Sequence, residues 1–168
     1  MVLTAFSDGR FLLGERWVRC ALGRGGVVPG SAKVEGDGAS PLGAFRLEAV
    51  FFRPDREAPP ATGLPVRALQ PEDGWSDAPE DPRSNRLVTH PHPYSAERLW
   101  REDGIYDLLV VLGHNTDPPN AGAGSAIFLH LAREEFTPTQ GCVALARSDL
   151  LELLRGAAPG DRLEIKGM

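Results

Sequence analysis

Nine prolines lie between residues 53 and 93, and they restrict the fold of this chain more than any other feature of its sequence. Proline lacks a backbone N–H and fixes its own φ, so it is excluded from helix interiors and central strands. The sequence therefore predicts a long irregular segment over about 53–93. This segment holds Trp75, Leu87 and Val88 and is followed directly by Tyr94, apolar groups that a fully solvated linker does not need. We expect an ordered loop folded over the functional site.

The rest of the chain contains short apolar runs that are typical of β-strands. Residues 11–13 and 17–22 are two such runs separated by a glycine, which indicates a hairpin. Residues 44–52 alternate between apolar and polar, as a half-buried strand does. Residues 106–112 form a continuous and partly β-branched run, typical of a buried strand. Residues 125–131 are expected to form the next strand and to pair with it.

Two short helices are also expected. One covers residues 95–102 and the other residues 148–155, each with a serine at its N-cap, and Gly156 ends the second. Residues 33–43 are predicted to form a glycine-rich loop closed by a proline. The sequence therefore predicts one mainly β domain over residues 1–168.

Composition excludes several classes of protein. A chain of 168 residues with 42% hydrophobic content can bury one sizeable core. The formal net charge of −5 and the pI near 5.4 argue against nucleic acid as a partner, because phosphate binding requires a basic face. No apolar stretch approaches the length of a transmembrane span.

A histidine and a cysteine mark the candidate active site. The apolar run 126–129 ends at His130, the pattern of a buried strand that delivers a polar group. Cys142 follows twelve positions later, directly after a glycine. A thiol needs a nearby base to act as a nucleophile at neutral pH. We therefore predict that Cys142 is a nucleophile and that His130 is its general base.

The residues around the cysteine are expected to shape its turn. Gly141 allows backbone N–H groups to converge on a carbonyl oxygen, as an oxyanion hole requires. Thr139 and Gln140 are expected to shape the turn and to offer hydrogen bonds. Cys20 could in principle form a disulfide with Cys142. Its place in an alternating strand favours a small buried side chain instead, and hence a free Cys142.

Three motifs together resemble the YkuD-type L,D-transpeptidase catalytic domain family. The family carries a histidine at a strand end, followed by Ser/Thr-x-Gly-Cys and a hydrophobic residue. The matching positions in this chain are His130, Thr139, Gln140, Gly141, Cys142 and Val143. Residues 33–45, with Ser-Pro-Leu-Gly-Ala-Phe at their end, and residues 159–165 resemble two further segments of the family. The resemblance spans roughly residues 20–166, and it implies a β-sandwich-like mixed sheet of short strands.

Three features depart from the family pattern. The spacing between His130 and Cys142 is shorter than usual. Gln140 stands where the family often has histidine, and Ala144 stands where many members have arginine. These differences concern how the charged groups of the substrate are held, and therefore which peptide is accepted.

The resemblance implies a cysteine-dependent L,D-transpeptidase that acts on peptidoglycan stem peptides through a thioester acyl-enzyme. No cofactor is implied, and carbapenem β-lactams are expected covalent inhibitors. Two alternatives stay open. In an L,D-carboxypeptidase or cross-link hydrolase, water would resolve the same thioester, and the motifs do not separate this reaction from transfer. The other alternative is a non-catalytic wall-binding domain of the same fold.

The resemblance also implies a location in the periplasm or cell envelope. Residues 1–8 lack the basic start and long apolar segment of a secretory signal, so the cytoplasm is the alternative expectation.

Several further polar residues are candidates for substrate contacts. Asp77, Asn85 and Arg86 lie in the proline-rich segment, where they could meet a charged peptide. His114 and Asn115 follow the buried strand, and His114 is either a second polar wall of the site or an ordinary loop residue. No metal is expected, because the histidines and cysteines lack the close, paired spacing typical of metal sites.

Overall fold

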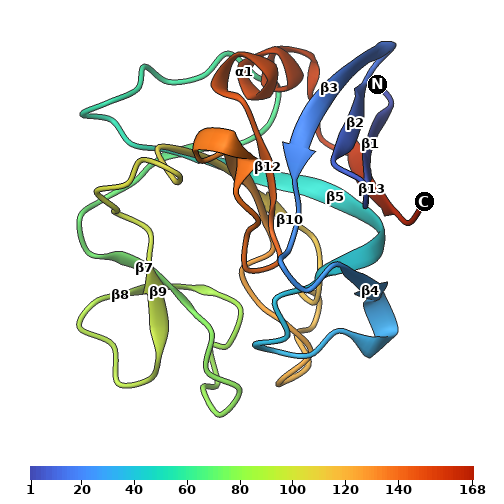
Figure 1. The fold of residues 1–168 in the computed structure, drawn as a ribbon. Coiled ribbons are helices and arrows are strands. Elements are labelled where there is room, and N and C mark those ends of the chain that lie inside the picture. Colours follow the sequence, from blue (N-terminus) through green and yellow to red (C-terminus); the bar gives the residue numbers. More distant parts are fainter.

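The computed structural model describes residues 1–168 and consists mainly of β-strands (Figure 1). The strands are β1 (Leu3–Phe6), β2 (Arg10–Leu13), β3 (Arg16–Ala21), β4 (Val27–Pro29), β5 (Ser40–Phe52), β6 (Val66–Ala68), β7 (Asp73–Ser76), β8 (Leu87–Thr89), β9 (Ala96–Arg98), β10 (Leu108–Leu112), β11 (Phe128–Leu131), β12 (Val143–Leu145) and β13 (Arg162–Lys166). The one α-helix is α1 (Arg147–Gly156), and two 3-10 turns are η1 (Gly30–Ala32) and η2 (Glu134–Phe136). The predicted mainly β fold is confirmed. None of these helices is both long and apolar enough to span a membrane.

Most strands join one mixed sheet that returns on itself. Its neighbours follow the order β10-β11-β12-β3-β2-β1-β13-β5-β4, and β6 adds to β5. The long strand β5 pairs with β13 over Gly43–Arg46 and with β10 over Leu47–Phe52, which closes the ring. The predicted hairpin is β2–β3, and the predicted neighbours β10 and β11 pair antiparallel. The strands β11 and β12 pair in parallel, so that Leu129 lies opposite Val143 and His130 lies opposite Ala144.

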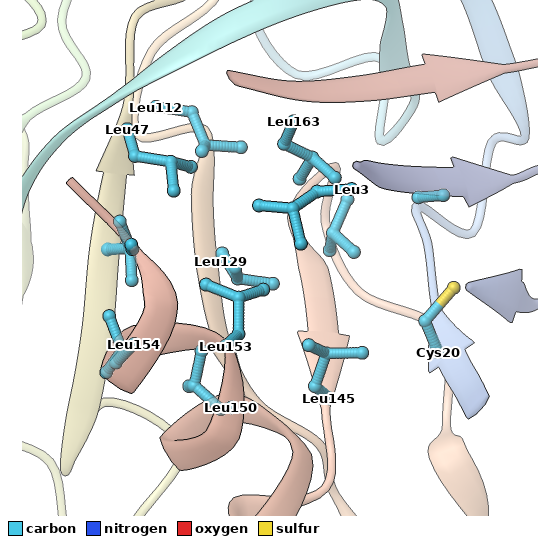
Figure 2. Packing of buried hydrophobic residues seen from close by; sticks show 14 of the residues in the cluster. Leu3, Cys20, Leu47, Leu112, Leu129, Leu145, Leu150, Leu153, Leu154 and Leu163 are labelled. Carbon is cyan, nitrogen blue, oxygen red and sulfur yellow. The ribbon is translucent and has the colours of Figure 1, made fainter. Parts of the chain in front are cut away.

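Helix α1 packs its leucines into the main core. Leu150, Leu153 and Leu154 recur at spacings of three and four residues, so they share one face of the helix, and all three are fully buried. Figure 2 shows them beside Leu129 of β11 and Leu145 of β12. Each buried leucine contributes roughly 1.5–3 kcal/mol of transfer free energy. The helix therefore stabilises the two strands that bring the candidate catalytic residues together.

A second core lies on the other face of β10. Leu108, Val110 and Leu112 belong to the main core, whereas Leu109 and Val111 alternate into a cluster of 11 buried residues. This second cluster is covered by a separate three-stranded sheet of order β8-β7-β9, which Figure 1 shows to one side of the main sheet.

The prediction of an irregular segment over 53–93 is wrong in part, because this segment contains β6, β7 and β8. The strand β7 lies between Pro71 and Pro79 and is itself free of proline. It therefore keeps the N–H groups needed to pair with β8 on one side and β9 on the other. The prolines confine these strands to three or four residues instead of excluding them.

The prediction of a helix over 95–102 is also wrong, since Ala96–Arg98 forms the strand β9. Its register with β7 pairs Ser76 with Ala96 and Gly74 with Arg98. This pairing outweighs the helix propensity of the segment, because intrinsic propensity is weak and is often overridden by tertiary contacts.

Two boundaries differ from the predicted ones. Helix α1 begins at Arg147 after Ala146, which offers no side-chain cap, and it includes Gly156, so Ser148 is not the cap. The predicted loop over 33–43 ends earlier, because β5 begins at Ser40 and pairs in parallel with β4.

Candidate active site

The parallel pairing of β11 and β12 brings His130 and Cys142 to one face of the sheet. Leu129 stands opposite Val143, and His130 stands opposite Ala144. Side chains alternate along a strand, so Cys142, two residues before Ala144, points to the same face as His130. Cys142, directly before β12, is therefore a diagonal neighbour of His130 on β11, and both residues line one cavity.

The thiol of Cys142 is buried and held by the backbone next to β11. Its Sγ donates to the carbonyl oxygen of Ala126 at 3.1 Å and accepts from the N–H of Phe128 at 3.3 Å. Burial raises the pKa of the thiol to about 12, with a further contribution from the negative charge of Glu97. The resting protein therefore holds a neutral thiol. Both Cys142 and Cys20 are free, which confirms the prediction that they form no disulfide.

His130 is buried and is held in one tautomer. Its Nδ1 lies 2.9 Å from the carbonyl oxygen of Leu131, which can only accept, so Nδ1 carries the hydrogen and Nε2 presents a lone pair. Burial lowers the pKa of His130 to about 4. The imidazole is thus neutral at physiological pH. A neutral histidine beside a neutral thiol can accept the thiol proton as the sulfur attacks a carbonyl carbon.

Hydrogen bonds across the turn fix the backbone that presents the cysteine. The Thr139 hydroxyl donates to the carbonyl oxygen of Cys142 at 2.6 Å and accepts from the N–H of Gly141 at 3.1 Å. Gly141 has φ +136°, and a Cβ at this position would lie 2.8 Å from the carbonyl oxygen of Ala39. Both the backbone conformation and the close approach require glycine here. The Ser40 hydroxyl donates to the carbonyl oxygen of Gly141 at 2.8 Å.

The other two residues of the cysteine motif differ in their placement. Gln140 lines the cavity together with Thr139. Val143 is fully buried in the main core on the opposite face of β12, so it shapes the site by packing and does not face the cavity.

The cavity has a volume of about 650 Å³ and carries both signs of charge. Its acidic residues are Glu35, Asp77 and Glu97, and its basic residues are Arg101 and Arg133. From the proline-rich segment, Asp77 alone lies in the cavity wall. An Asp77 oxygen is buried there without a hydrogen-bond partner. The cavity therefore suits a ligand that has both positive and negative groups.

Sequence reasoning missed Tyr106 and Glu97, which lie beside the candidate catalytic pair. The Tyr106 ring meets His130 edge-on with centroids 5.3 Å apart, and its hydroxyl donates to Glu97 Oε1 at 2.5 Å. Burial raises the pKa of Tyr106 well above 10, and its neighbours Cys142 and Glu97 add to the shift. The sequence predicts Tyr106 as the start of a buried strand and Glu97 as part of a short helix, and no local sequence signal indicates that either lies in the site.

Asn85 is an anchor between the small sheet and the loop that joins β10 to β11. Its Oδ1 accepts from Trp75 Nε1 at 2.8 Å and from the N–H of Ala126 at 3.1 Å. Its Nδ2 donates to the carbonyl oxygens of His114 at 3.1 Å and Asn115 at 2.6 Å. Asn85 is buried and does not line the cavity. The geometry therefore favours a structural role over the predicted substrate contact.

The remaining predicted contact residues lie outside the cavity. Arg86 borders a separate hollow with Thr116 and Asp117. His114 is buried with its Nε2 3.1 Å from the carbonyl oxygen of Ala123, and it is not part of the cavity wall. Asn115 donates to the carbonyl oxygens of Asn120 and Gly124 within its own loop, both at 2.9 Å.

No group of three histidine, cysteine or acidic side chains is arranged to hold a metal ion. His92 makes a buried hydrogen bond from Nε2 to Asp81 at 2.6 Å, and this pair lies outside the cavity.

Comparison with known proteins gives one match. The family model of the L,D-transpeptidase catalytic domain, YkuD, matches residues 2–165. No curated protein and no solved structure matches the chain.

Proposed function

Because this chain belongs to the L,D-transpeptidase catalytic domain family, we propose that it is a cysteine-dependent L,D-transpeptidase that acts on peptidoglycan stem peptides. The observation that carries the proposal is the placement of Cys142 and His130 on one face of adjacent strands, inside a cavity of about 650 Å³. The substrate class and a place of action at the cell envelope come from the family.

In the first half-reaction, the sulfur of Cys142 attacks the carbonyl carbon of the donor peptide bond. The thiol proton moves to Nε2 of His130 as the C–S bond forms, and the carbonyl oxygen becomes an oxyanion. Backbone N–H groups of Gln140 and Cys142 are the proposed oxyanion donors, because the N–H of Gly141 already donates to the Thr139 hydroxyl. The protonated His130 then gives its proton to the leaving D-amino acid as the peptide bond breaks. A thioester between the donor and Cys142 remains.

The neutral state of both residues supports this sequence of proton transfers. The Leu131 carbonyl oxygen holds the hydrogen on Nδ1, which leaves Nε2 free to accept the thiol proton. The raised pKa of Cys142 and the lowered pKa of His130, both caused by burial, disfavour a resting thiolate–imidazolium pair. The proton is therefore transferred when the substrate is in place.

In the second half-reaction, an amine from a neighbouring stem peptide attacks the thioester and forms the cross-link. Attack by water instead would give an L,D-carboxypeptidase or a cross-link hydrolase, and both reactions require the same first half-reaction.

Intact-mass analysis of the protein mixed with a disaccharide-tetrapeptide, with and without a second stem as acceptor, tests the proposal. A cross-linked dimer that depends on Cys142 is the expected product, and Cys142→Ala is the control. Loss of the terminal D-residue without a dimer would favour the hydrolase. No Cys142-dependent change with several stem types would favour a wall-binding domain.

A further inference from the structure

Glu97 is held in the cavity by a single strong hydrogen bond. Its Oε1 accepts from the Tyr106 hydroxyl at 2.5 Å, and its Oε2 makes no hydrogen bond or ion pair. The ring of Tyr106 packs edge-on against His130, with centroids 5.3 Å apart, so the carboxylate is tied to the catalytic residues through one side chain. The Glu97 side chain is 28% exposed, which makes it accessible to a ligand in the cavity.

Several charged groups face this carboxylate. Asp77 and Glu35 line the same cavity, and Arg101 Nη1 lies 4.0 Å from Oε1. Arg101 is itself engaged by Asp103, through bonds of 3.0 and 2.7 Å. Burial raises the pKa of Glu97, and the charges of Asp77 and Glu35 add to this shift. The surroundings thus favour a bound cation beside Glu97 or a proton on it.

The second half-reaction needs a base that the catalytic pair does not supply. An acceptor amine is protonated at neutral pH, and an ammonium group has no lone pair with which to attack a thioester. His130 has already passed its proton to the leaving group and can handle only the proton released during the attack. The ammonium must also lose a second proton, to solvent or to another group in the cavity.

We propose that Glu97 is a catalytic residue of the acyl-transfer step, which binds the ammonium group of the acceptor stem and removes its first proton. Tyr106 is the positioning residue that holds Glu97 beside the thioester. This inference rests on the proposed function and concerns the second half-reaction alone.

The protons and bonds balance as follows. The ammonium gives one proton to the Glu97 carboxylate, which becomes a carboxylic acid, and the amine nitrogen gains a free lone pair. The nitrogen attacks the thioester carbon, and the C–S bond breaks as the new amide bond forms. The second amine proton passes through Nε2 of His130 to the leaving sulfur, which restores the Cys142 thiol. Glu97 later releases its proton to solvent.

The test measures the ratio of aminolysis to hydrolysis of the thioester. This ratio does not depend on how much acyl-enzyme each variant forms. Two acceptors are compared at neutral pH: a stem peptide, whose amine is protonated, and hydroxylamine, which is largely unprotonated. The variants are Glu97→Gln and Tyr106→Phe. Glu102→Gln is the matched control, because Glu102 is 92% exposed and lies outside the cavity.

For Glu97→Gln we expect the ratio with the stem peptide to fall roughly 100-fold, the contribution of a general base. With hydroxylamine the ratio should stay near that of the parent protein. Tyr106→Phe should show a smaller loss with the same dependence on the acceptor, which keeps the test open if Glu97→Gln does not fold.

Three results would overturn the inference. They are an unchanged ratio in Glu97→Gln, an equal loss with both acceptors, and an equal loss in Glu102→Gln. If the parent protein forms no Cys142-dependent thioester, the proposed function fails as well, and this outcome is distinct from the other three.

Discussion

The Ser40 hydroxyl donates a hydrogen bond of 2.8 Å to the carbonyl oxygen of Gly141, although 101 residues separate them in the chain. The same hydroxyl oxygen accepts from the N–H of Gly23 at 2.9 Å. Ser40 thus joins the start of β5 and the residues after β3 to the turn that presents Cys142. The segment that resembles the Ser-Pro-x-Gly-x-Phe motif of the family is therefore a support of the active site.

Replacing Ser40 with alanine should weaken this support. The buried carbonyl of Gly141 and the N–H of Gly23 would lose their partner, which costs about 1–3 kcal/mol of unfolding free energy. Urea unfolding measures the loss, and the rate of thioester formation on Cys142 measures its effect on the site. Ser31→Ala is the control, since Ser31 is exposed. Equal stability of the two variants would contradict this role of Ser40.

A side chain at Gly141 should damage the site more severely. Gly141→Ala places a Cβ 2.8 Å from the carbonyl oxygen of Ala39 and imposes φ +136° on an L-residue. We expect a loss of about 1–3 kcal/mol in stability and a loss of at least about tenfold in the rate of thioester formation. Gly167→Ala, where no atom lies within 4 Å of the new Cβ, should behave like the parent protein. Acylation of Gly141→Ala at the parental rate would refute the requirement for glycine.

Asn85→Ala should weaken the connection between the small sheet and the loop that joins β10 to β11. The change removes four hydrogen bonds and leaves the N–H groups of Trp75 and Ala126 without acceptors. We expect a loss of about 2–4 kcal/mol. The measurement is urea unfolding, with Asn120→Ala as the control, because Asn120 is exposed and its side chain makes no hydrogen bond. A substrate-contact role alone would lower activity and leave the unfolding free energy unchanged.

The sequence predicted the elements whose signals are local. The continuous run of β10, the hairpin β2–β3 and the face of α1 that holds Leu150, Leu153 and Leu154 all follow from the period of their apolar residues. The motif around Cys142 also pointed to the candidate catalytic pair, and the structure requires the glycine of that motif at position 141.

The elements that the sequence did not predict depend on long-range pairing. Whether Ala96–Arg98 forms a strand is decided by its register with β7, and no residue within it signals this. The same pairing carries Glu97 into the cavity, where it meets Tyr106. Because a helix was predicted over residues 95–102, Glu97 was not among the predicted residues of the candidate site. Asn85 was recognised as polar, but its four partners come from distant parts of the chain.

The neutral state of Cys142 predicts slow alkylation in the absence of substrate. Iodoacetamide reacts with thiolates, and burial raises the pKa of this thiol to about 12. At pH 8 we expect alkylation of Cys142 to be at least about 100-fold slower than that of free cysteine. Mass spectrometry of the modified peptide across pH 7–10 gives the rate, and Cys142→Ala isolates the reaction of Cys20. An inflection below pH 8 would show an activated thiolate at rest and would contradict proton transfer upon substrate binding.

Buried, neutral His130 should make the protein less stable in mild acid. Its folded pKa of about 4 lies below the ordinary value of 6.5, so between these values the unfolded chain binds the proton more readily. The contribution of His130 to stability is therefore complete above about pH 6.5 and is lost as the pH falls to about 4, a change of about 3 kcal/mol. Asp103, whose pKa Arg101 holds at about 2, loses its contribution only in stronger acid. Urea unfolding at pH 7 and pH 4.5 measures the change. His130→Gln should remove most of it, whereas His90→Gln, which changes a histidine outside the cavity, should retain it. An equal loss in all three proteins would assign the acid sensitivity to other groups.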